Sequence, residues 1–408
     1  MAKPRPDKSA PSVWPALGHE QREWISRFNT DDLTRGQRER MRLPYAAAIT
    51  PPIADLRIDI PSDLAADADE ATGLLTRFDA EVGPAGLPFA SILLRTESAS
   101  SSEIEHLTSG ARAIAEAELG ERDTGNAAQI VHNVRSIEAA LSLADSIDGQ
   151  SITAMQTALL GSFAPELTGG WRNEQVWIGG SSLSPHLAEF VPPHHERVSQ
   201  AMDDLVAFIA RLDVPALAHV AIAHAQFETI HPFPDGNGRT GRAVVQAMLR
   251  QCEVTKHITV PVSAGLLHDV DGYYDALNSY RHGDIRPIIA AFARAAGYAV
   301  VNGRQLVRDI AGIEAEWEEK MLGLRSDAAA RRVAVLAIAH PVLNYETVTR
   351  ELSIAPTTAF RALESLVDRG VLHPANSGRR NRIWLAVPVL NSLDDFAARA
   401  GRRRLAKG

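Results

Sequence analysis

Residues 231–242 read His-Pro-Phe-Pro-Asp-Gly-Asn-Gly-Arg-Thr-Gly-Arg and separate two segments whose apolar residues recur at helical spacing. Proline and glycine mark this stretch as a loop between helices. Gly236 and Gly238 flank Asn237, and glycine allows the positive φ angles that turn successive N–H groups toward one point. The sequence therefore predicts a mostly α-helical protein with an anion-binding loop at the start of a helix.

The same loop carries side chains suited to phosphoryl-transfer chemistry. Arg239 and Arg242 lie three residues apart in the first turn of the following helix, so both guanidinium groups can reach an anion held there. Asp235 offers a hard oxygen ligand that suits magnesium, and His231 is a base that titrates near neutral pH. A lone histidine after a helix is usually structural, but this setting favours catalysis.

Residues 231–242 match every specified position of the Fic signature His-Pro-Phe-x-Asp/Glu-Gly-Asn-Gly-Arg-x-x-Arg. Over roughly residues 40–305 the chain resembles the Fic family of protein adenylyltransferases. The resemblance implies transfer of AMP from magnesium-bound ATP to a Tyr, Thr or Ser hydroxyl of a protein target or of the chain itself. A family branch that phosphorylates its target alters the glycine after Asn and the final arginine, and this chain keeps Gly238 and Arg242. The alternative is a DNA-binding transcription regulator whose Fic core only senses nucleotide.

The resemblance also implies a role for each residue of the loop. His231 would deprotonate the attacking hydroxyl, Asp235 would ligate magnesium, and Phe233 would pack the loop into the core. Asn237 and the loop amides would hold the α-phosphate, and the two arginines would bind the β- and γ-phosphates. The implied phosphate ligands are Gly236, Asn237, Gly238, Arg239 and Arg242.

An upstream segment, Ser101-Ser-Glu-Ile-Glu105, is similar to the family's inhibitory motif Ser/Thr-x-x-x-Glu-Gly/Asn. The resemblance implies that Glu105 pairs with Arg242 and keeps it from the γ-phosphate. His106 stands where the family has Gly or Asn. Ser102 and Glu105 also fit a capping box that would start a helix, and this alternative stays open.

Residues 169–180, Gly-Gly-Trp-Arg-Asn-Glu-Gln-Val-Trp-Ile-Gly-Gly, place aromatic and β-branched residues between glycine pairs, which predicts a short β-hairpin. An exposed hairpin edge can align an extended peptide. Residues 171–182 are similar to the family's flap, and residues 190–193 are similar to the strap after it. The expected target-docking residues are Val176, Trp177 and Ile178.

Two pairs of aromatic side chains flank the loop in sequence. Tyr273 and Tyr274 are similar to the family's segment beside the nucleoside, and packing in the core is the alternative. His219 and His224 lie five residues apart on one helix and point to different faces, so packing is favoured over metal binding.

Charge is distributed unevenly along the chain. The net charge of -8 argues against a protein that coats nucleic acid, yet residues 331–408 carry 13 Lys or Arg and 6 Asp or Glu, a net +7 against -15 for the remainder. We therefore expect a domain boundary near residue 330.

This C-terminal part favours a winged helix, which usually reads DNA and otherwise docks protein. The expected elements are helices over 331–339, 345–352 and 355–369 and wing strands over 371–373 and 383–386. The DNA-binding candidates are Thr357, Thr358 and Arg361 for the major groove and Arg379, Arg380 and Arg382 for phosphates.

Elsewhere we expect a helix over 19–28, an extended stretch over 45–55, helical periodicity from residue 102 onward, and two helices over 285–301 and 306–324. The expected architecture is a Fic-type helical bundle with a β-hairpin flap, an N-terminal helical module and a C-terminal winged helix-turn-helix. The expected boundaries are 1–100 for the N-terminal Fic-associated module, 101–305 for the catalytic core, 306–330 for a linker helix, 331–390 for the winged helix and 391–408 for a basic tail.

Cys252 is the single cysteine, so neither an internal disulfide nor a thiolate zinc site is expected. No apolar leader segment follows Met1, and the apolar runs are interrupted by charge. We expect a cytoplasmic protein whose partners are ATP, a protein target and DNA, with no membrane partner. An oligomer is compatible with the sequence.

Overall fold

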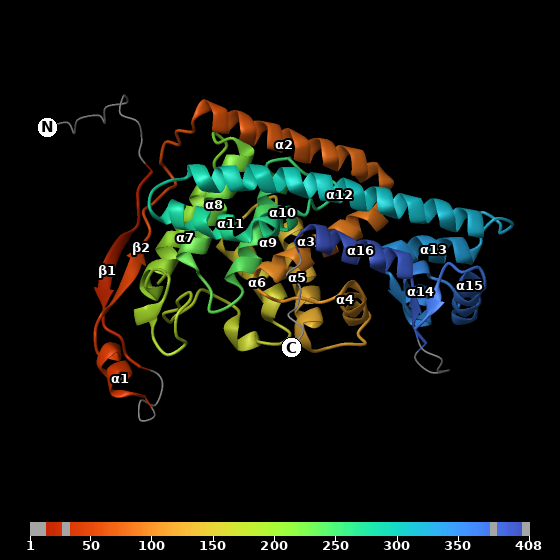
Figure 1. Cartoon of the computed structure of the whole chain (residues 1–408), viewed down its shortest axis with the longest axis horizontal. Helices are drawn as coiled ribbons and strands as arrows, with labels where there is room; N and C mark the ends of the chain where they lie inside the picture. The colour runs from red at the N-terminus through yellow and green to blue at the C-terminus, as the bar shows by residue number, and fades with distance from the viewer. Residues whose placement is uncertain (1–13, 27–32, 376–381, 402–408) are drawn as a thin grey trace.

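The computed structural model describes residues 14–26, 33–375 and 382–401. Within these ranges the chain forms sixteen α-helices, five short strands and the 3₁₀ turns Gly83–Ala85, Pro165–Leu167 and Pro185–Leu187 (Figure 1). The mostly helical class predicted from the sequence is confirmed. None of the helices in the described ranges is both long and apolar enough to cross a bilayer.

A two-stranded antiparallel ribbon projects from one side of the helical bundle (Figure 1). It consists of β1 (Gly18–Arg22) and β2 (Tyr45–Ile49), and the short helix α1 (Arg35–Met41) lies at its tip. The extended stretch predicted over 45–55 is confirmed for residues 45–49, which form β2, whereas a turn lies at residues 54 and 55. The predicted helix over 19–28 is wrong for the described residues 19–26: residues 19–22 pair with β2 as a strand and residues 23–26 form no helix, while residues 27 and 28 lie outside the described residues.

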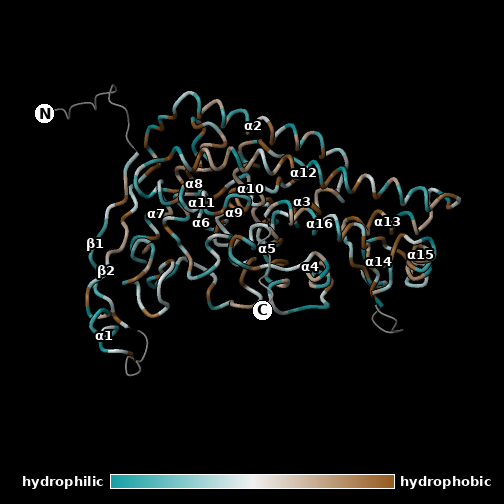
Figure 2. The backbone as a smooth tube through the Cα atoms, viewed as in Figure 1, coloured by the Kyte–Doolittle hydropathy of each residue, from teal (hydrophilic) through white to brown (hydrophobic). Residues whose placement is uncertain are grey.

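Two long helices, α2 (Ser62–Val82) and α12 (Arg286–Lys320), lie side by side along one face of the bundle (Figure 1). Polar and apolar residues alternate along both, as expected of helices with one face on the core (Figure 2). The two predicted helices over 285–301 and 306–324 are in fact the single helix α12. Gly303 does not break it but lets α2 approach, because a methyl group there would lie 2.8 Å from the Phe78 ring.

The centre of the molecule is α8 (Ala216–Ile230), which is buried from Leu217 to Ile230 and therefore on every face. The helical part of the chain was predicted to start at residue 102, which is too late. The helices α2 and α3 precede this residue, α3 ends near it, and α4 starts after a turn. The other helices of this part are α3 (Leu87–Ile104), α4 (Ala111–Glu118), α5 (Gly125–Ser142), α6 (Gly149–Leu160), α7 (His195–Ile209), α9 (Asn237–Gln251), α10 (Val262–His268) and α11 (Val270–Arg281).

The flap segment, residues 169–180, lies beside the end of α8 but contains no strand. The predicted β-hairpin is therefore wrong. Its one ladder contact is an antiparallel bridge between Ile178 and Phe190. Gly179 and Gly180 both have positive φ, and Gly180 packs so closely that a methyl group there would lie 2.3 Å from the carbonyl oxygen of Leu187. Both glycines therefore adopt a backbone conformation that residues with a Cβ atom rarely take.

The C-terminal part contains the three helices and the two strands predicted there, in the predicted order. Its sheet has the antiparallel order β3-β5-β4, and β3 was not predicted. The tip residues 376–381 lie outside the described residues. The elements are α13 (Ala329–Ala339), β3 (Val342–Leu343), α14 (Tyr345–Leu352), α15 (Pro356–Asp368), β4 (His373–Pro374) and β5 (Trp384–Leu385).

A last helix, α16 (Val387–Arg399), includes residues 391–399 of the predicted basic tail, and residues 402–408 of that tail lie outside the described residues. Phe396 on this helix is 1% exposed, and its carbonyl accepts a hydrogen bond from Asn302 of α12 at 3.1 Å. One apolar core runs without interruption from α2 to α16. The charge change near residue 330 therefore does not coincide with a break in the hydrophobic core.

Candidate active site

The loop between α8 and α9 is set by residues that cannot continue a helix. His231 ends α8 in the left-handed conformation, with φ 52° and ψ 62°, and Pro232 follows it. Gly236, also left-handed with φ 80°, is the N-cap of α9. Phe233 is fully buried, and its ring lies 5.1 Å from the ring of Trp171. The loop is thus anchored in the core, as expected for Phe233.

Asn237 fixes the shape of this loop. Its Oδ1 accepts a hydrogen bond from the Phe233 backbone N–H at 2.8 Å, and its Nδ2 donates to the Phe233 carbonyl at 2.8 Å. Both polar groups of the side chain are therefore engaged. The side chain thus holds the loop, and the backbone N–H of Asn237 at the start of α9 offers the expected contact with an α-phosphate.

A cavity of about 290 Å³ opens over the start of α9. Its wall includes Glu105, His231, Asp235, Gly238 and Arg239. Arg239 is 4% exposed, and its Nε and Nη1 have no hydrogen-bond partner among the described residues. Burial lowers the pKa of its guanidinium. An unpaired buried cation beside a helix N-terminus is an environment that favours an anionic ligand.

Arg242 is already occupied by the end of α3. Its Nε donates to Ser101 Oγ at 2.9 Å, and its Nη2 donates to the Ser101 carbonyl and to Glu105 Oε1, both at 2.8 Å. Burial alone would raise the pKa of Glu105, but the charge of Arg242 lowers it overall. The carboxylate lies directly over Gly238, where an added methyl group would be 1.9 Å from Oε1. Glu105 thus occupies a place that an anion would take.

The alternative that Ser102 and Glu105 start a helix is wrong. Glu105 is the C-cap of α3, which ends at Ile104. His106 follows with a left-handed φ of 62°, and the Leu107 N–H donates to the Ser102 carbonyl at 3.0 Å. Gly and Asn adopt this conformation most easily, which explains why the inhibitory motif has them at the position of His106.

His231 lies at the edge of the cavity with a side chain that is 20% exposed. Burial, assisted by the nearby charge of Arg172, lowers its pKa to about 4, so the imidazole is neutral at pH 7 and can accept a proton. Its Nδ1 is 3.9 Å from Oε2 of Glu228, a residue one turn earlier on α8. Burial raises the pKa of Glu228 to about 7. Glu228 was not among the predicted site residues. Its position three residues before His231 indicates that the two side chains can meet.

Residues 146–249 match the model of the Fic/DOC family. The chain carries a Fic domain. It is similar to protein adenylyltransferase Fic of Nematostella vectensis, with 31% identity over 154 residues that cover 37% of this chain and 32% of that protein. It is also similar to protein adenylyltransferase fic-1 of Caenorhabditis elegans, with 28% identity over 153 residues, 37% of this chain and 27% of that protein.

These curated relatives are matched over about a third of their own length or less. A solved Fic family protein from Desulfovibrio desulfuricans shares the fold more widely. Its TM-score is 0.52 at 21% identity, over 83% of this chain and 98% of that chain. This likeness concerns the fold alone.

The two tyrosines near the Fic domain have different surroundings. Tyr273 is buried, and its hydroxyl lies 2.7 Å from Nε2 of His224. Tyr274 is 39% exposed and donates to the carbonyl of Ile104, at the end of α3, at 3.2 Å. Only Tyr274 has a side chain on the surface that can meet a nucleoside. The packing role expected for His219 and His224 is confirmed, since His219 Nε2 lies 2.9 Å from the Phe208 carbonyl.

The three expected docking residues of the flap, Val176, Trp177 and Ile178, are half-buried. Trp177 donates through Nε1 to the Ser181 carbonyl at 2.8 Å, and its ring lies 5.4 Å from that of Trp24. The N-terminal segment that contains β1 therefore packs against the flap.

Only part of the expected DNA-binding face is available. Thr357, Thr358 and Arg361 are exposed on α15. Arg382 instead pairs with Glu364 at 3.1 Å and lies over the rings of Phe360 and Trp384, so its predicted phosphate contact is not supported. Arg379 and Arg380 lie outside the described residues.

Proposed function

We propose that this protein is an adenylyltransferase that moves AMP from magnesium-bound ATP to a Tyr, Thr or Ser hydroxyl of a protein target or of its own chain. One observation carries the proposal: a neutral His231 faces the same cavity as the N-terminus of α9 and the unpaired, buried Arg239. A base and a polyphosphate site then share one cavity. The adenylyltransferase names of the relatives agree with this activity.

In the proposed reaction, each bond that forms is matched by one that breaks, and His231 takes up the proton that is released. The target hydroxyl oxygen forms a bond to the α-phosphorus, the bond from that phosphorus to the bridging oxygen breaks, and pyrophosphate leaves. The proton of the hydroxyl passes to Nε2 of His231. Arg239, Arg242 and the N–H groups at the start of α9 stabilise the charge of the phosphates.

Asp235 fits the role of a magnesium ligand. It is exposed at the cavity, and its Oδ1 accepts the Gly236 N–H at 2.6 Å, which orients the carboxylate and leaves Oδ2 for a cation. Magnesium bound there would offset the charge of the leaving pyrophosphate.

We further propose that Glu105 inhibits this activity. Its carboxylate holds Arg242 and lies over Gly238, so the γ-phosphate and the carboxylate compete for one place. ATP that binds without Arg242 would present its α-phosphorus in a different pose.

The second candidate function is DNA binding by the C-terminal part. The exposed Thr357, Thr358 and Arg361 on α15 support it. A regulator that only senses nucleotide would bind ATP and DNA without turnover.

Mass spectrometry separates these functions. The purified chain, incubated with magnesium, ATP and cell lysate, should gain or confer the mass of one AMP per modified hydroxyl. His231→Ala should abolish this transfer while ATP still binds. ATP binding with no AMP adduct in either the wild-type or the Glu105→Gly protein would favour the nucleotide sensor.

A further inference from the structure

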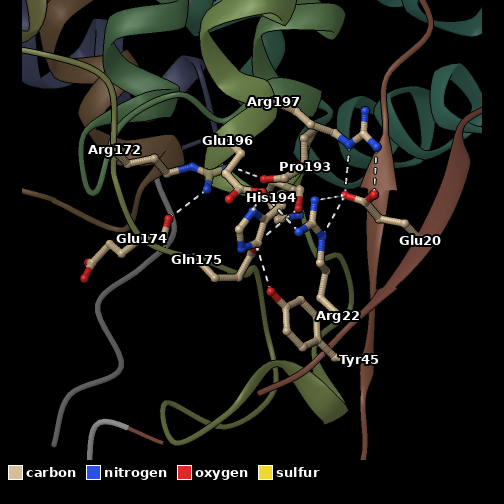
Figure 3. Close-up of polar contacts among 11 residues, drawn as sticks. Glu20, Arg22, Tyr45, Arg172, Glu174, Gln175, Pro193, His194, Glu196 and Arg197 are labelled. Carbon is tan, nitrogen blue, oxygen red and sulfur yellow. Dashed lines mark hydrogen bonds and ion pairs between the residues drawn. The ribbon is translucent and has the colours of Figure 1, made fainter. Parts of the chain in front are cut away.

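Arg172, at the base of the flap, is a buried cation whose hydrogen bonds go to backbone carbonyls. Its residue is 3% exposed. Nε donates to the His231 carbonyl at 2.8 Å and Nη1 donates to the Glu174 carbonyl at 2.8 Å. Nη2 donates to the carbonyls of Pro193 at 2.5 Å and of Ile230 at 3.4 Å. Figure 3 shows the guanidinium reaching Glu174 and Pro193 across the gap between the flap and the strap.

The cost of burying this side chain indicates a role beyond packing. Removing a guanidinium from water is unfavourable unless its donors are satisfied. Burial accordingly lowers the pKa of Arg172 to about 10. Its planar fork meets carbonyls from three separate segments, a geometry that a single ammonium group cannot reproduce.

Two of these carbonyls belong to the end of α8, where helix carbonyls lack partners within the helix. Arg172 supplies that partner from another segment, and its charge lies at the negative end of the helix dipole. Its own backbone N–H donates to the Pro232 carbonyl at 2.9 Å. Arg172 therefore holds the chain at Ile230, His231 and Pro232, through the left-handed turn that directs the imidazole.

A second flap residue, Gln175, connects the flap and the strap to the N-terminal ribbon by hydrogen bonds. Gln175 donates through Nε2 to the Pro192 carbonyl at 3.0 Å and accepts from the Tyr45 hydroxyl at 3.2 Å (Figure 3). Consecutive carbonyls of the strap, Pro192 and Pro193, are thus held by Gln175 and Arg172. The flap, the strap and β2 form one hydrogen-bonded unit that ends on the carbonyl of His231.

We propose that Arg172 is a positioning residue for His231, which caps α8 from the flap and so couples the flap to the base. This inference rests on the proposed adenylyl transfer. A shift of about 1 Å in a catalytic group can lower the rate about 100-fold. Arg172 is not among the residues that line the cavity over the start of α9, so its replacement should leave the proposed ATP site intact.

Three variants test the proposal in the Glu105→Gly background, with Arg197→Met as the matched control. Arg197 is a second arginine of this region, and it donates to Glu20, at 2.9 and 2.7 Å (Figure 3). Arg172→Met should lower kcat for AMP transfer about 100-fold, with the Kd for ATP unchanged. Arg172→Lys should keep the fold and a reduced kcat. Ethylguanidinium should restore part of the kcat of Arg172→Ala, and ethylammonium should not. Arg197→Met should keep kcat.

Wild-type kcat in Arg172→Lys would overturn the proposal. The proposal would also be overturned if the kcat of Arg172→Ala fell only in proportion to the fraction of folded protein and ethylguanidinium did not restore it. A readout independent of turnover uses ¹⁵N-histidine NMR, with the His231 ring signals assigned from their loss in His231→Ala. The Lys variant should broaden or shift these signals. Unchanged signals would overturn the positioning role even if the protein transfers no AMP, whereas changed signals without AMP transfer would contradict only the proposed function.

Discussion

Replacing Glu105 with glycine removes the carboxylate that lies over Gly238 and pairs with Arg242 at 2.8 Å. Arg242 is 2% exposed and keeps its two hydrogen bonds to Ser101, so it stays in place for a phosphate. The C-cap position of Glu105, with φ -86°, accepts glycine without strain. The change therefore opens the anion site and leaves its walls intact.

The expected change in ATP affinity follows from the ion pair that is lost. A hydrogen bond to a charged group contributes about 1.5–3 kcal/mol, and each 1.4 kcal/mol is a factor of ten. ATP no longer has to displace this carboxylate, so its Kd should fall about 10- to 100-fold. Without ATP, the buried Arg242 loses its counter-charge, and the free energy of unfolding should fall by about 1–3 kcal/mol.

The assay measures the ATP Kd by calorimetry, AMP incorporation by mass spectrometry and Tm with and without magnesium-ATP. Glu103→Gly is the matched control, because it loosens the same helical turn while its side chain lines a different cavity, between α3, α4 and α16. We expect Glu105→Gly alone to bind ATP more tightly and to transfer AMP faster. Equal activation by both variants, or unchanged ATP affinity in Glu105→Gly, would refute competition for the anion site.

Three further predictions follow from single side chains. In the Glu105→Gly background, Arg242→Ala should weaken ATP binding by about 1.5–3 kcal/mol, and unchanged affinity in calorimetry would remove Arg242 from the site. The pKa of Glu228 rises from 4.5 to about 7 on folding. Ionisation of Glu228 therefore lowers the free energy of unfolding above pH 7, and it has no such effect below pH 4.5, where the carboxyl group is protonated in both states. Glu228→Gln should therefore stabilise the protein by roughly 3 kcal/mol at most at pH 8 and much less at pH 5; urea unfolding that gives equal gains at both pH values would contradict this. The full chain should bind duplex DNA with an affinity that falls with salt, and Arg361→Ala should weaken it; no binding at low salt would favour protein docking.

The loop between α8 and α9 could be predicted from the sequence because its constraints are local. Proline, paired glycines and closely spaced arginines define a turn and a helix start within twelve residues, and Phe233 lies in the core as expected. The Glu105 contact with Arg242 was reachable only through the family resemblance. These residues are 137 positions apart, and no periodicity relates them.

The remaining features depend on tertiary contacts that local patterns do not encode. Residues 18–22 are a strand only because β2 pairs with them, and α12 continues through Gly303 because α2 packs there. Nothing in the sequence distinguishes Arg172 from the other polar residues of the flap. Its contact with the carbonyl of His231 depends on the fold. The flap pairs only through the bridge between Ile178 and Phe190, two residues that no local pattern relates.

The target hydroxyl should attack the α-phosphorus of ATP, and labelled ATP tests this directly. The Glu105→Gly protein should be incubated with magnesium and either α-labelled or γ-labelled ATP, and protein-bound label should be counted beside the His231→Ala version of the same variant. Transfer of AMP predicts label on protein from α-labelled ATP alone, and its loss when His231 is replaced. Protein labelled only from γ-labelled ATP, or labelled equally without His231, would contradict the account.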